Sequence, residues 1–415
     1  MVRSAPVPRR LPLLPIFLIV LVDVFGLAMI IPLLTIYAEQ FGATALEATL
    51  LISIYAVCQL FSGPLLGKIS DRIGRKPLLV VSQIGTFIGF IVMARATSLW
   101  MLYAARVIDG STAGNISLAQ AYISDNSDPK DRTKSFALIG IAFGLGFLIG
   151  PLLTAYLVRY SLNAPIYAAS GMSLSSIVCT LSLLPSNGVP KHAGAIEAGP
   201  GGTRLPLFEW KTYGQYFARP LMNGLLGQFF FYALGFSTFT SGFALFAERR
   251  FTWYGHPFTP REIGFVLVYV GALGIILQGG LIGRLAKRFG EPTLVSAGFV
   301  SLVVAYLILG PASSIRWLVV VSTISSFGNG VLRPALTSLV SQNAGPHEQG
   351  VALGLSQSLN SVAQIVAPIV GGILIGRELL TLWAWVAAVA AFLGLVGARW
   401  GSSLVRLRQA QTPAQ

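Results

Sequence analysis

The stretch GKISDRIGRK at residues 67–76 places a dense cluster of charges between two long apolar segments. Charged side chains are costly inside a bilayer, so such a cluster requires a short loop at the surface of a membrane. A degraded copy, GRLAKRFG, occurs at residues 283–290, in the second half of the chain. The two copies predict a membrane protein with two related halves, an organisation that is typical of secondary transporters.

The composition is that of an integral membrane protein. Charged residues make up 11% of the 415-residue chain and hydrophobic residues 54%, whereas soluble domains contain about 25% charged residues. Too few polar residues remain to cover the surface of a soluble protein of this size. Apolar segments of about 20 residues, the length that spans a bilayer core, recur along the chain. The twelve predicted transmembrane helices lie near 12–36, 48–69, 78–96, 98–123, 135–159, 164–184, 218–247, 262–283, 292–311, 315–340, 351–376 and 378–400.

The net charge of +14 follows this topology. Most Lys and Arg residues fall in loops on the side of residues 67–76, which the positive-inside rule assigns to the cytoplasm. We therefore predict a multi-pass protein with both termini in the cytoplasm. The basic charge reflects topology, so nucleic-acid binding is not expected.

Cysteine and histidine contents argue against metal or disulfide chemistry. Cys58 and Cys179 lie within predicted helices, and the three histidines lie in predicted loops. Neither a disulfide framework nor a histidine metal site inside the membrane is expected, and we expect no cofactor. The predicted outward loops contain no N-x-[ST] sequon, which favours a bacterial inner membrane.

Residues 185–217 are rich in Gly and Pro and predict a linker between two halves. We expect an N-terminal six-helix bundle at 1–184, a cytoplasmic linker at 185–217, and a C-terminal six-helix bundle with a short cytoplasmic tail at 218–415. A shift of about 216 residues along the chain aligns Arg72 with Arg288. Such a repeat implies two bundles related by an axis along the membrane normal, with a substrate site between them near the midplane.

The run at 67–76 resembles the signature loop of the major facilitator superfamily, G-x-x-x-D-R-x-G-R-[RK]. Each marked position is present, namely Gly67, Asp71, Arg72, Gly74, Arg75 and Lys76. The stretch 102–106 followed by Gly110 is similar to the Arg motif of its fourth helix. Gly146, Gly150 and Pro151 resemble the Gly–Pro motif in the fifth helix of its antiporters.

Within the superfamily, residues 23–27, 31–32, 328–330 and 333–336 resemble the drug:proton antiporters related to tetracycline-efflux proteins. This resemblance implies an all-α fold of twelve transmembrane helices in two six-helix bundles, and proton-coupled export. Tetracycline pumps carry an acidic residue in the third helix, where this chain has Gly89, and ionisable residues in the eighth and ninth helices, where this chain has none. Tetracycline itself is therefore not the expected substrate.

Asp23 lies inside the first apolar segment. An unpaired carboxylate there costs several kcal/mol, so it must be protonated or paired. A group that gains and loses a proton as its solvation changes suits a proton-driven exchanger. The alternative is that Asp23 is a structural residue bonded to neighbouring helices. Arg106 and Asp109 are spaced i, i+3 and can meet on a helix. They form either a self-neutralising ion pair or part of the proton-coupling site, and the resemblance favours coupling for Arg106.

Two further roles follow for the motifs. Asp71 can approach the N-terminus of a helix in the other half, and the basic residues of its loop can pair with Asp125 or Asp128, so that the loop latches the closed cytoplasmic side. A pure topology anchor is the alternative. The small residues Gly146 and Gly150, with Pro151, predict a close helix contact between the halves that limits proton leak, or ordinary helix packing.

The remaining candidates are polar or aromatic residues of the predicted helices. They could line a substrate site or bond neighbouring helices, and Arg333 could equally extend to the cytoplasmic surface. They are Asn115, Gln120, Gln228, Tyr232, Gln278, Asn329, Arg333, Gln357 and Asn360.

These observations predict a proton-coupled exporter of lipophilic small molecules or drugs that works by alternating access. The expected partners are the substrate, protons and the lipid bilayer, and we expect a monomer. A proton-coupled uptake symporter for a sugar, peptide or organic anion is the alternative. An enzyme is not expected, because neither H-E-x-x-H nor G-x-S-x-G occurs.

Overall fold

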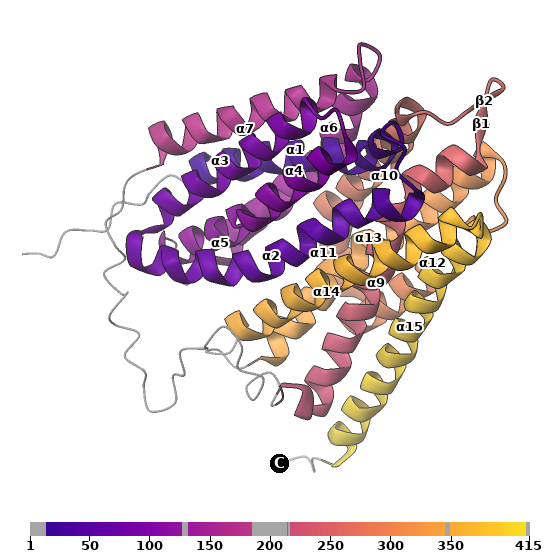
Figure 1. Ribbon diagram of the computed structural model, residues 1–415. Helices are drawn as coiled ribbons and strands as arrows, with labels where there is room; N and C mark the ends of the chain where they lie inside the picture. The colour runs from indigo at the N-terminus through magenta and orange to yellow at the C-terminus, as the bar shows by residue number, and fades with distance from the viewer. Residues whose placement is uncertain (1–13, 127–131, 185–213, 215, 345–348, 412–415) are drawn as a thin grey trace, which may run out of the picture.

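The computed structural model describes residues 14–126, 132–184, 214, 216–344 and 349–411, and these form an almost entirely helical protein (Figure 1). The first half contains α1 (Leu14–Glu39), α2 (Ala45–Ile73), α3 (Arg75–Ala94), α4 (Leu99–Ser111), α5 (Asn115–Asn126), α6 (Arg132–Leu157) and α7 (Ala164–Leu183). The second half contains α9 (Pro220–Arg250), α10 (Pro260–Ile276), the π-helical turn η1 (Leu277–Leu281), α11 (Ile282–Phe289), α12 (Glu291–Leu309), α13 (Ile315–Asn343), α14 (Gln349–Gly376) and α15 (Leu380–Gln411). The short strands β1 (Thr252–Trp253) and β2 (His256–Pro257) pair antiparallel between α9 and α10.

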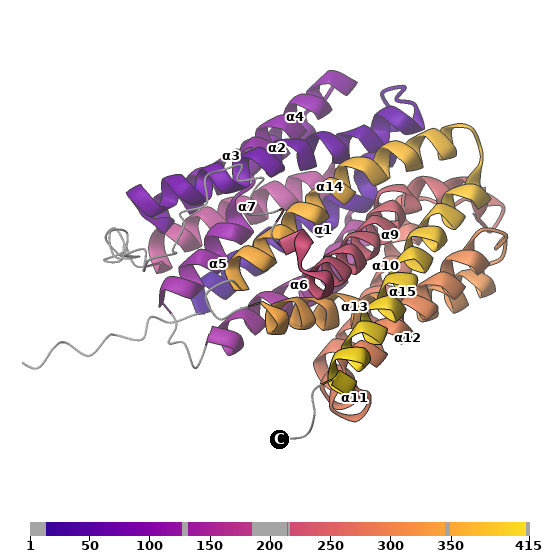
Figure 2. The same cartoon turned by 90° about the horizontal axis from the view of Figure 1, so that it is seen from below.

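The helices form two bundles, one from each half (Figures 1 and 2). Each of the twelve predicted segments corresponds to one helix or to consecutive helices: the fourth to α4 and α5, the eighth to α10, η1 and α11. Within the described residues, nine helices are long and apolar enough to cross a membrane, and α6 adds a shorter apolar stretch at Gly144–Leu157. The predicted all-α membrane fold is confirmed.

Equivalent helix starts reveal the internal repeat. Thr44 begins α2 with a capping box, in which its side chain accepts from the Glu47 amide while the Glu47 carboxylate accepts from the Thr44 amide at 2.8 Å. Thr259 and Glu262 form the same reciprocal arrangement at the start of α10. A capping box satisfies amides that the first helical turn leaves without partners. The two boxes lie 215 residues apart (259 − 44), close to the shift predicted from the sequence.

The glycine of the signature run has a conformational reason. Gly74, between α2 and α3, has φ 97°, and Gly290, between α11 and α12, has φ 78°. Only glycine adopts such angles readily, because a Cβ would clash with the backbone. Each glycine amide also donates to the carbonyl four residues earlier, at 3.0 Å. The copies at 67–76 and 283–290 therefore specify the same sharp turn between two helices.

The predicted fourth span is interrupted, in contrast to the continuous segment expected from hydropathy. Ser82 of α3 holds the break, because its hydroxyl donates to the Thr112 carbonyl and accepts from the Gly114 amide at 3.0 Å. Ser62 of α2 donates to the Gly110 carbonyl at 2.7 Å. A membrane helix can be broken where neighbouring side chains satisfy the freed backbone groups.

The two ends of the molecule differ in how closely the bundles approach. We call the end that carries Gly74 and Gly290 the loop end, and the opposite end the distal end. The distal end carries the connections at 40–44, 95–98, 158–163, 251–259, 310–314 and 377–379. In Figure 1 the ribbons of the bundles lie closer together at the distal end than at the loop end.

Glycines allow this close approach. A Cβ at Gly271 of α10 would lie 2.8 Å from the Phe147 carbonyl oxygen and 3.0 Å from the Leu148 Cα of α6. A Cβ at Gly372 of α14 would lie 2.7 Å from the Leu46 Cα of α2. All three are backbone atoms, which cannot move aside as a flexible side chain can. The two inter-bundle seams, α6–α10 and α2–α14, therefore depend on the absence of side chains at these positions.

Replacing Gly271 with Ala is expected to open the distal end, because the new methyl overlaps α6 backbone and overpacking costs about 1–3 kcal/mol. Gly274, one turn along the same helix, has open space at its Cβ position and is the matched control. We expect the distance between spin labels at Thr97 and Ser313, one on each bundle, to increase in Gly271→Ala and to stay unchanged in Gly274→Ala. Equal distances in the two variants would contradict this packing.

Candidate functional site

Asp23 lies on α1 inside the first bundle, as predicted. Both carboxylate oxygens are inaccessible to solvent and have no hydrogen-bond partner of acceptable geometry among the described residues. Ser176 of α7 and Asn115, the first residue of α5, face this carboxylate. The break in the fourth span therefore brings the N-terminus of α5, the positive end of the helix dipole, toward Asp23.

A network of uncharged polar groups continues from Asp23. Gln83 of α3, which is fully buried, donates from Nε2 to the Ser176 hydroxyl at 2.8 Å, and Ser173 donates to the Gln83 carbonyl at 3.3 Å. The Gln83 Oε1 atom, like the Asn115 Oδ1 atom, has no partner within the part of the chain that the structure describes. Gln83 and Ser176 were not among the residues predicted from the sequence. Two features of the sequence could have indicated them. Gln83 is a lone amide in one apolar segment, and Ser176 belongs to a row of serines in another.

Arg106 and Asp109 meet as their spacing predicted. Arg106 Nη2 lies 2.9 Å from Asp109 Oδ2, and the two side chains are 4% and 5% exposed. The guanidinium also lies over the Tyr55 ring of α2, 5.4 Å from its centroid. Tyr55 is within electrostatic reach of Asp109, Arg106 and Asp23. The pair and the lone Asp23 carboxylate thus belong to one buried polar region of the first bundle.

Gly89 explains how the pair fits. A Cβ at Gly89 of α3 would lie 3.0 Å from the Asp109 Cβ and 3.1 Å from the Ala105 carbonyl oxygen. The fourth span therefore packs directly on α3, and the space beside Gly89 is filled by Asp109. An acidic side chain on α3 at this position could not coexist with Asp109 in the same arrangement.

The signature loop makes contacts within its own bundle. Lys76 donates to the Leu181 carbonyl at 2.9 Å and to the Leu184 carbonyl at 2.6 Å, so it caps the C-terminal end of α7. Arg75 donates to the Ser70 hydroxyl and, at 3.5 Å, to the Gly67 carbonyl. The contacts of Lys76 were not predicted. Arg72 is exposed.

The predicted acidic partners of this loop cannot be placed. The Asp71 and Asp125 side chains, like all of Asp128, lie outside the described part of the structure. The latch therefore stays a prediction.

The Gly–Pro motif of α6 faces two neighbours. Its glycines face α1 of the same bundle: Gly146 packs on Val24, and a Cβ at Gly150 would lie 2.7 Å from the Ala28 Cβ. The Pro151 carbonyl oxygen faces the other bundle, where it lies 3.0 Å from the Cβ position of Gly264. The motif therefore takes part both in ordinary helix packing within the first bundle and in a close contact between the bundles. The α6 backbone makes the contact between the bundles.

The other candidates are dispersed. Gln228 and Tyr232 of α9 are buried, and Tyr232 is within electrostatic reach of Arg333 of α13. Asn329 faces the fully buried Tyr306 of α12, which the sequence analysis missed. Gln278, Arg333 and Gln357 are exposed, Asn360 is partly buried, and the Gln120 side chain lies outside the described residues. Among these candidates the second bundle thus contributes amides, aromatic rings and the exposed Arg333, whereas Asp23 and Asp109 both lie in the first bundle.

Comparison with known proteins agrees with this architecture. The sequence profile of the Major Facilitator Superfamily matches residues 16–291 and 251–414. The tetracycline resistance protein, class H, of Pasteurella multocida is 30% identical over 85% of this chain and 86% of its own length. The class B protein of Escherichia coli is 28% identical over 90% and 91%, and multidrug resistance protein 2 of Bacillus subtilis is 25% identical over 86% and 88%.

Solved structures share the fold. The human organic anion transporter MFSD10 superposes with a TM-score of 0.67 at 24% identity, covering 94% of this chain and all of that one. The nucleoside transporter NupG superposes with a TM-score of 0.75 at 14% identity, covering 94% and 99%. With two helical bundles, the repeated signature turn and a profile match over nearly the whole chain, this protein belongs to the Major Facilitator Superfamily.

Proposed function

We propose that this protein is a proton-coupled exporter of lipophilic small molecules that works by alternating access. The sequence is similar over most of its length to tetracycline and multidrug resistance proteins. The observation that supports coupling is the Asp23 carboxylate, which is buried in a membrane-spanning helix and has no cationic partner among the residues that the structure describes. Such a group exchanges a proton whenever its access to water changes.

The buried ion pair supports Asp23, rather than Asp109, as the acid that carries the proton. Protonating Asp109 would leave Arg106 buried without a counter-charge, and breaking a buried pair in this way costs about 3–5 kcal/mol. Protonating Asp23 breaks no ion pair and removes an uncompensated charge. We therefore assign the coupling proton to Asp23 and regard Arg106–Asp109 as a fixed charge pair that tunes it.

The orientation follows from the distribution of basic residues. The loop end carries the Lys- and Arg-rich turns, which supports its placement in the cytoplasm, and hence an outward-facing distal end. The described arrangement, with its inter-bundle seams near the distal end, then corresponds to closure on the outside. We further propose that the protein is a monomer in a bacterial inner membrane, with both termini in the cytoplasm.

The substrate we propose is lipophilic and drug-sized. The second bundle supplies Tyr232 stacked on Phe236, with ring centroids 6.0 Å apart, and buried amide groups rather than ionised ones. Sites of this chemistry favour apolar contact with a few orienting hydrogen bonds. Tetracycline is disfavoured, because Asp109 fills the space where the resembling pumps would place an acid on the third helix.

Asp23→Asn is expected to abolish uphill export driven by a pH gradient in proteoliposomes while leaving downhill exchange intact, because the amide cannot bind the coupling proton. Asp109→Asn is the contrasting variant: it should lower the melting temperature by stranding Arg106, whereas Asp23→Asn should not. Uphill export that persists in Asp23→Asn would refute the assignment.

A transport panel tests the substrate class. In proteoliposomes with an imposed pH gradient, we expect transport of lipophilic neutral and monocationic compounds. We expect no transport of sugars or organic phosphates. Drug susceptibility of an efflux-deficient host should fall on expression of the chain and return with Asp23→Asn. Robust sugar or phosphate flux, without any transport of lipophilic compounds, would favour the alternative function of a proton-coupled uptake symporter.

The latch proposed for the signature loop is testable by accessibility. In the state that is closed at the loop end, Asp71→Asn would remove the proposed charge–dipole contact, which is worth about 0.3–2 kcal/mol. We expect faster labelling of loop-end cysteines in this variant with unchanged expression. If labelling rates match the unaltered protein, the loop acts only as a topology anchor.

A further inference from the structure

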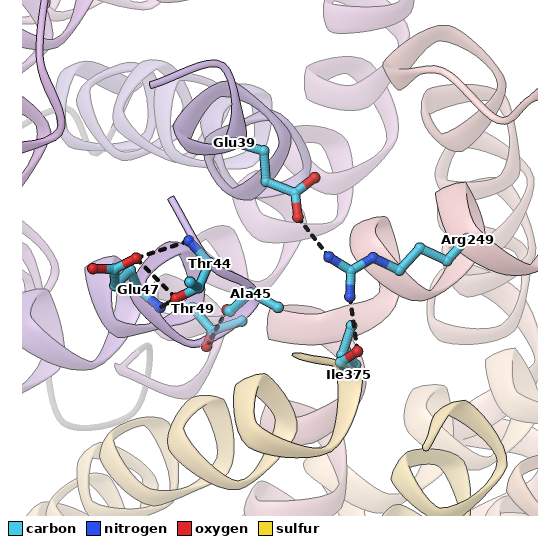
Figure 3. Close-up of polar contacts among 7 residues, drawn as sticks. All are labelled: Glu39, Thr44, Ala45, Glu47, Thr49, Arg249 and Ile375. Carbon is cyan, nitrogen blue, oxygen red and sulfur yellow. Dashed lines mark hydrogen bonds and ion pairs between the residues drawn. The ribbon is translucent and has the colours of Figure 1, made fainter. Parts of the chain in front are cut away.

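Arg249, near the end of α9, ties the two bundles together at the distal end. Its Nη2 atom lies 2.8 Å from Oε1 of Glu39, the last residue of α1, and its Nη1 atom donates to the Ile375 carbonyl of α14 at 2.8 Å (Figure 3). One guanidinium therefore contacts a carboxylate of the first bundle and the C-terminal end of a helix in its own bundle. None of these residues was among the candidates predicted from the sequence.

A second carboxyl group faces the same ion pair. Glu248, the neighbour of Arg249 on α9, is half-buried and faces Glu39. Its Oε2 atom is inaccessible to solvent and has no hydrogen-bond partner among the described residues. We call Glu39, Glu248 and Arg249 the distal charge cluster. It contains two acids and one base.

Other charged groups at this end are engaged elsewhere or exposed. Glu47 accepts from the Thr44 amide and hydroxyl in the capping box of α2. Arg250 donates from Nε to the Ala312 carbonyl, in the connection between α12 and α13, at 2.9 Å. Arg377 and Glu378 are exposed in the turn after α14. Within the described residues, the charges that act on Glu248 are therefore those of Glu39 and Arg249.

We infer that Glu39 and Glu248 together bind one proton when the distal end is closed, and that this proton stabilises closure. Two neighbouring carboxylates that share one cation repel each other, and a single proton bound between them removes the repulsion. The two acids belong to different bundles, so they separate and regain water when the distal end opens. The closed state then binds the proton more tightly than the open state, and by linkage the proton favours closure.

This inference rests on the proposed function for its physiological sense. If the distal end faces the outside, protons arriving there favour outer closure and hence the return to the state that is open to the cytoplasm. An exporter driven by proton entry needs this return step after it releases its substrate. The distal charge cluster would make the return depend on external acidity, separately from the coupling proton at Asp23.

The test is a distance measurement on the full-length protein in lipid nanodiscs, with spin labels at Thr97 and Ser313 and both native cysteines replaced by serine. All variants carry Asp23→Asn, so that titration of that residue does not contribute. Between pH 5.5 and pH 8.5 we expect the ratio of distal-closed to distal-open protein to fall by about tenfold or more, because one linked proton changes such a ratio by up to tenfold per pH unit.

In Glu248→Gln the ratio should stay high at both pH values, since the amide mimics the protonated acid. Glu39→Gln, a second isosteric variant, should likewise lose most of the pH dependence. The matched control is Glu47→Gln, at the same end but bonded within one bundle, and it should retain the full response. A pH response that survives in Glu248→Gln and Glu39→Gln, or that is lost in Glu47→Gln, would overturn the inference. The distance readout needs no transport, so an intact pH response together with absence of drug export by the protein that retains Asp23 would count against the proposed function alone.

Discussion

The absence of water from the bilayer core is the constraint on which the rest of this structure depends. Every backbone group within the spans must find a partner inside the protein, and every ionisable group must be paired or neutralised by a proton. The capping boxes at Thr44 and Thr259 meet this demand at the helix starts. Ser62 and Ser82 meet it at the break between α4 and α5, where hydroxyls replace the helical hydrogen bonds that are lost.

The same constraint separates the buried charges into two kinds. Arg106 and Asp109 neutralise each other at 2.9 Å, with the Tyr55 ring against the guanidinium. Asp23 lies in the same region of the first bundle but has no such partner in the described part of the chain. A fixed pair is a stable part of the scaffold, whereas a lone carboxylate changes its protonation with its surroundings. This difference between a paired and a lone carboxylate is the basis for proposing Asp23, rather than Asp109, as the coupling acid.

Contacts between the bundles must be close enough to seal one end and weak enough to break in each cycle. Backbone packing at Gly271 and Gly372 provides the seal without interlocking side chains. The Glu39–Arg249 pair adds an ionic contact between the bundles, and its side chains are 24% and 31% exposed. An ion pair with that much solvent contact contributes only about 0–1 kcal/mol after screening. A tie of this strength can bias two states without trapping the protein in either.

The sequence alone determined the membrane fold, the twelve segments, the two related halves and the i, i+3 meeting of Arg106 with Asp109, because hydropathy, charge distribution and helical spacing are local properties. The positive-φ turns at Gly74 and Gly290 were marked in the same way by the repeated signature run. Only the tertiary structure revealed the break in the fourth span, because the serines that stabilise it come from α2 and α3. It also brought Gln83 and Ser176 to Asp23, and Glu39 to Glu248 and Arg249, across 60 residues or more of chain. No local pattern encodes such encounters, since helix packing decides which faces meet.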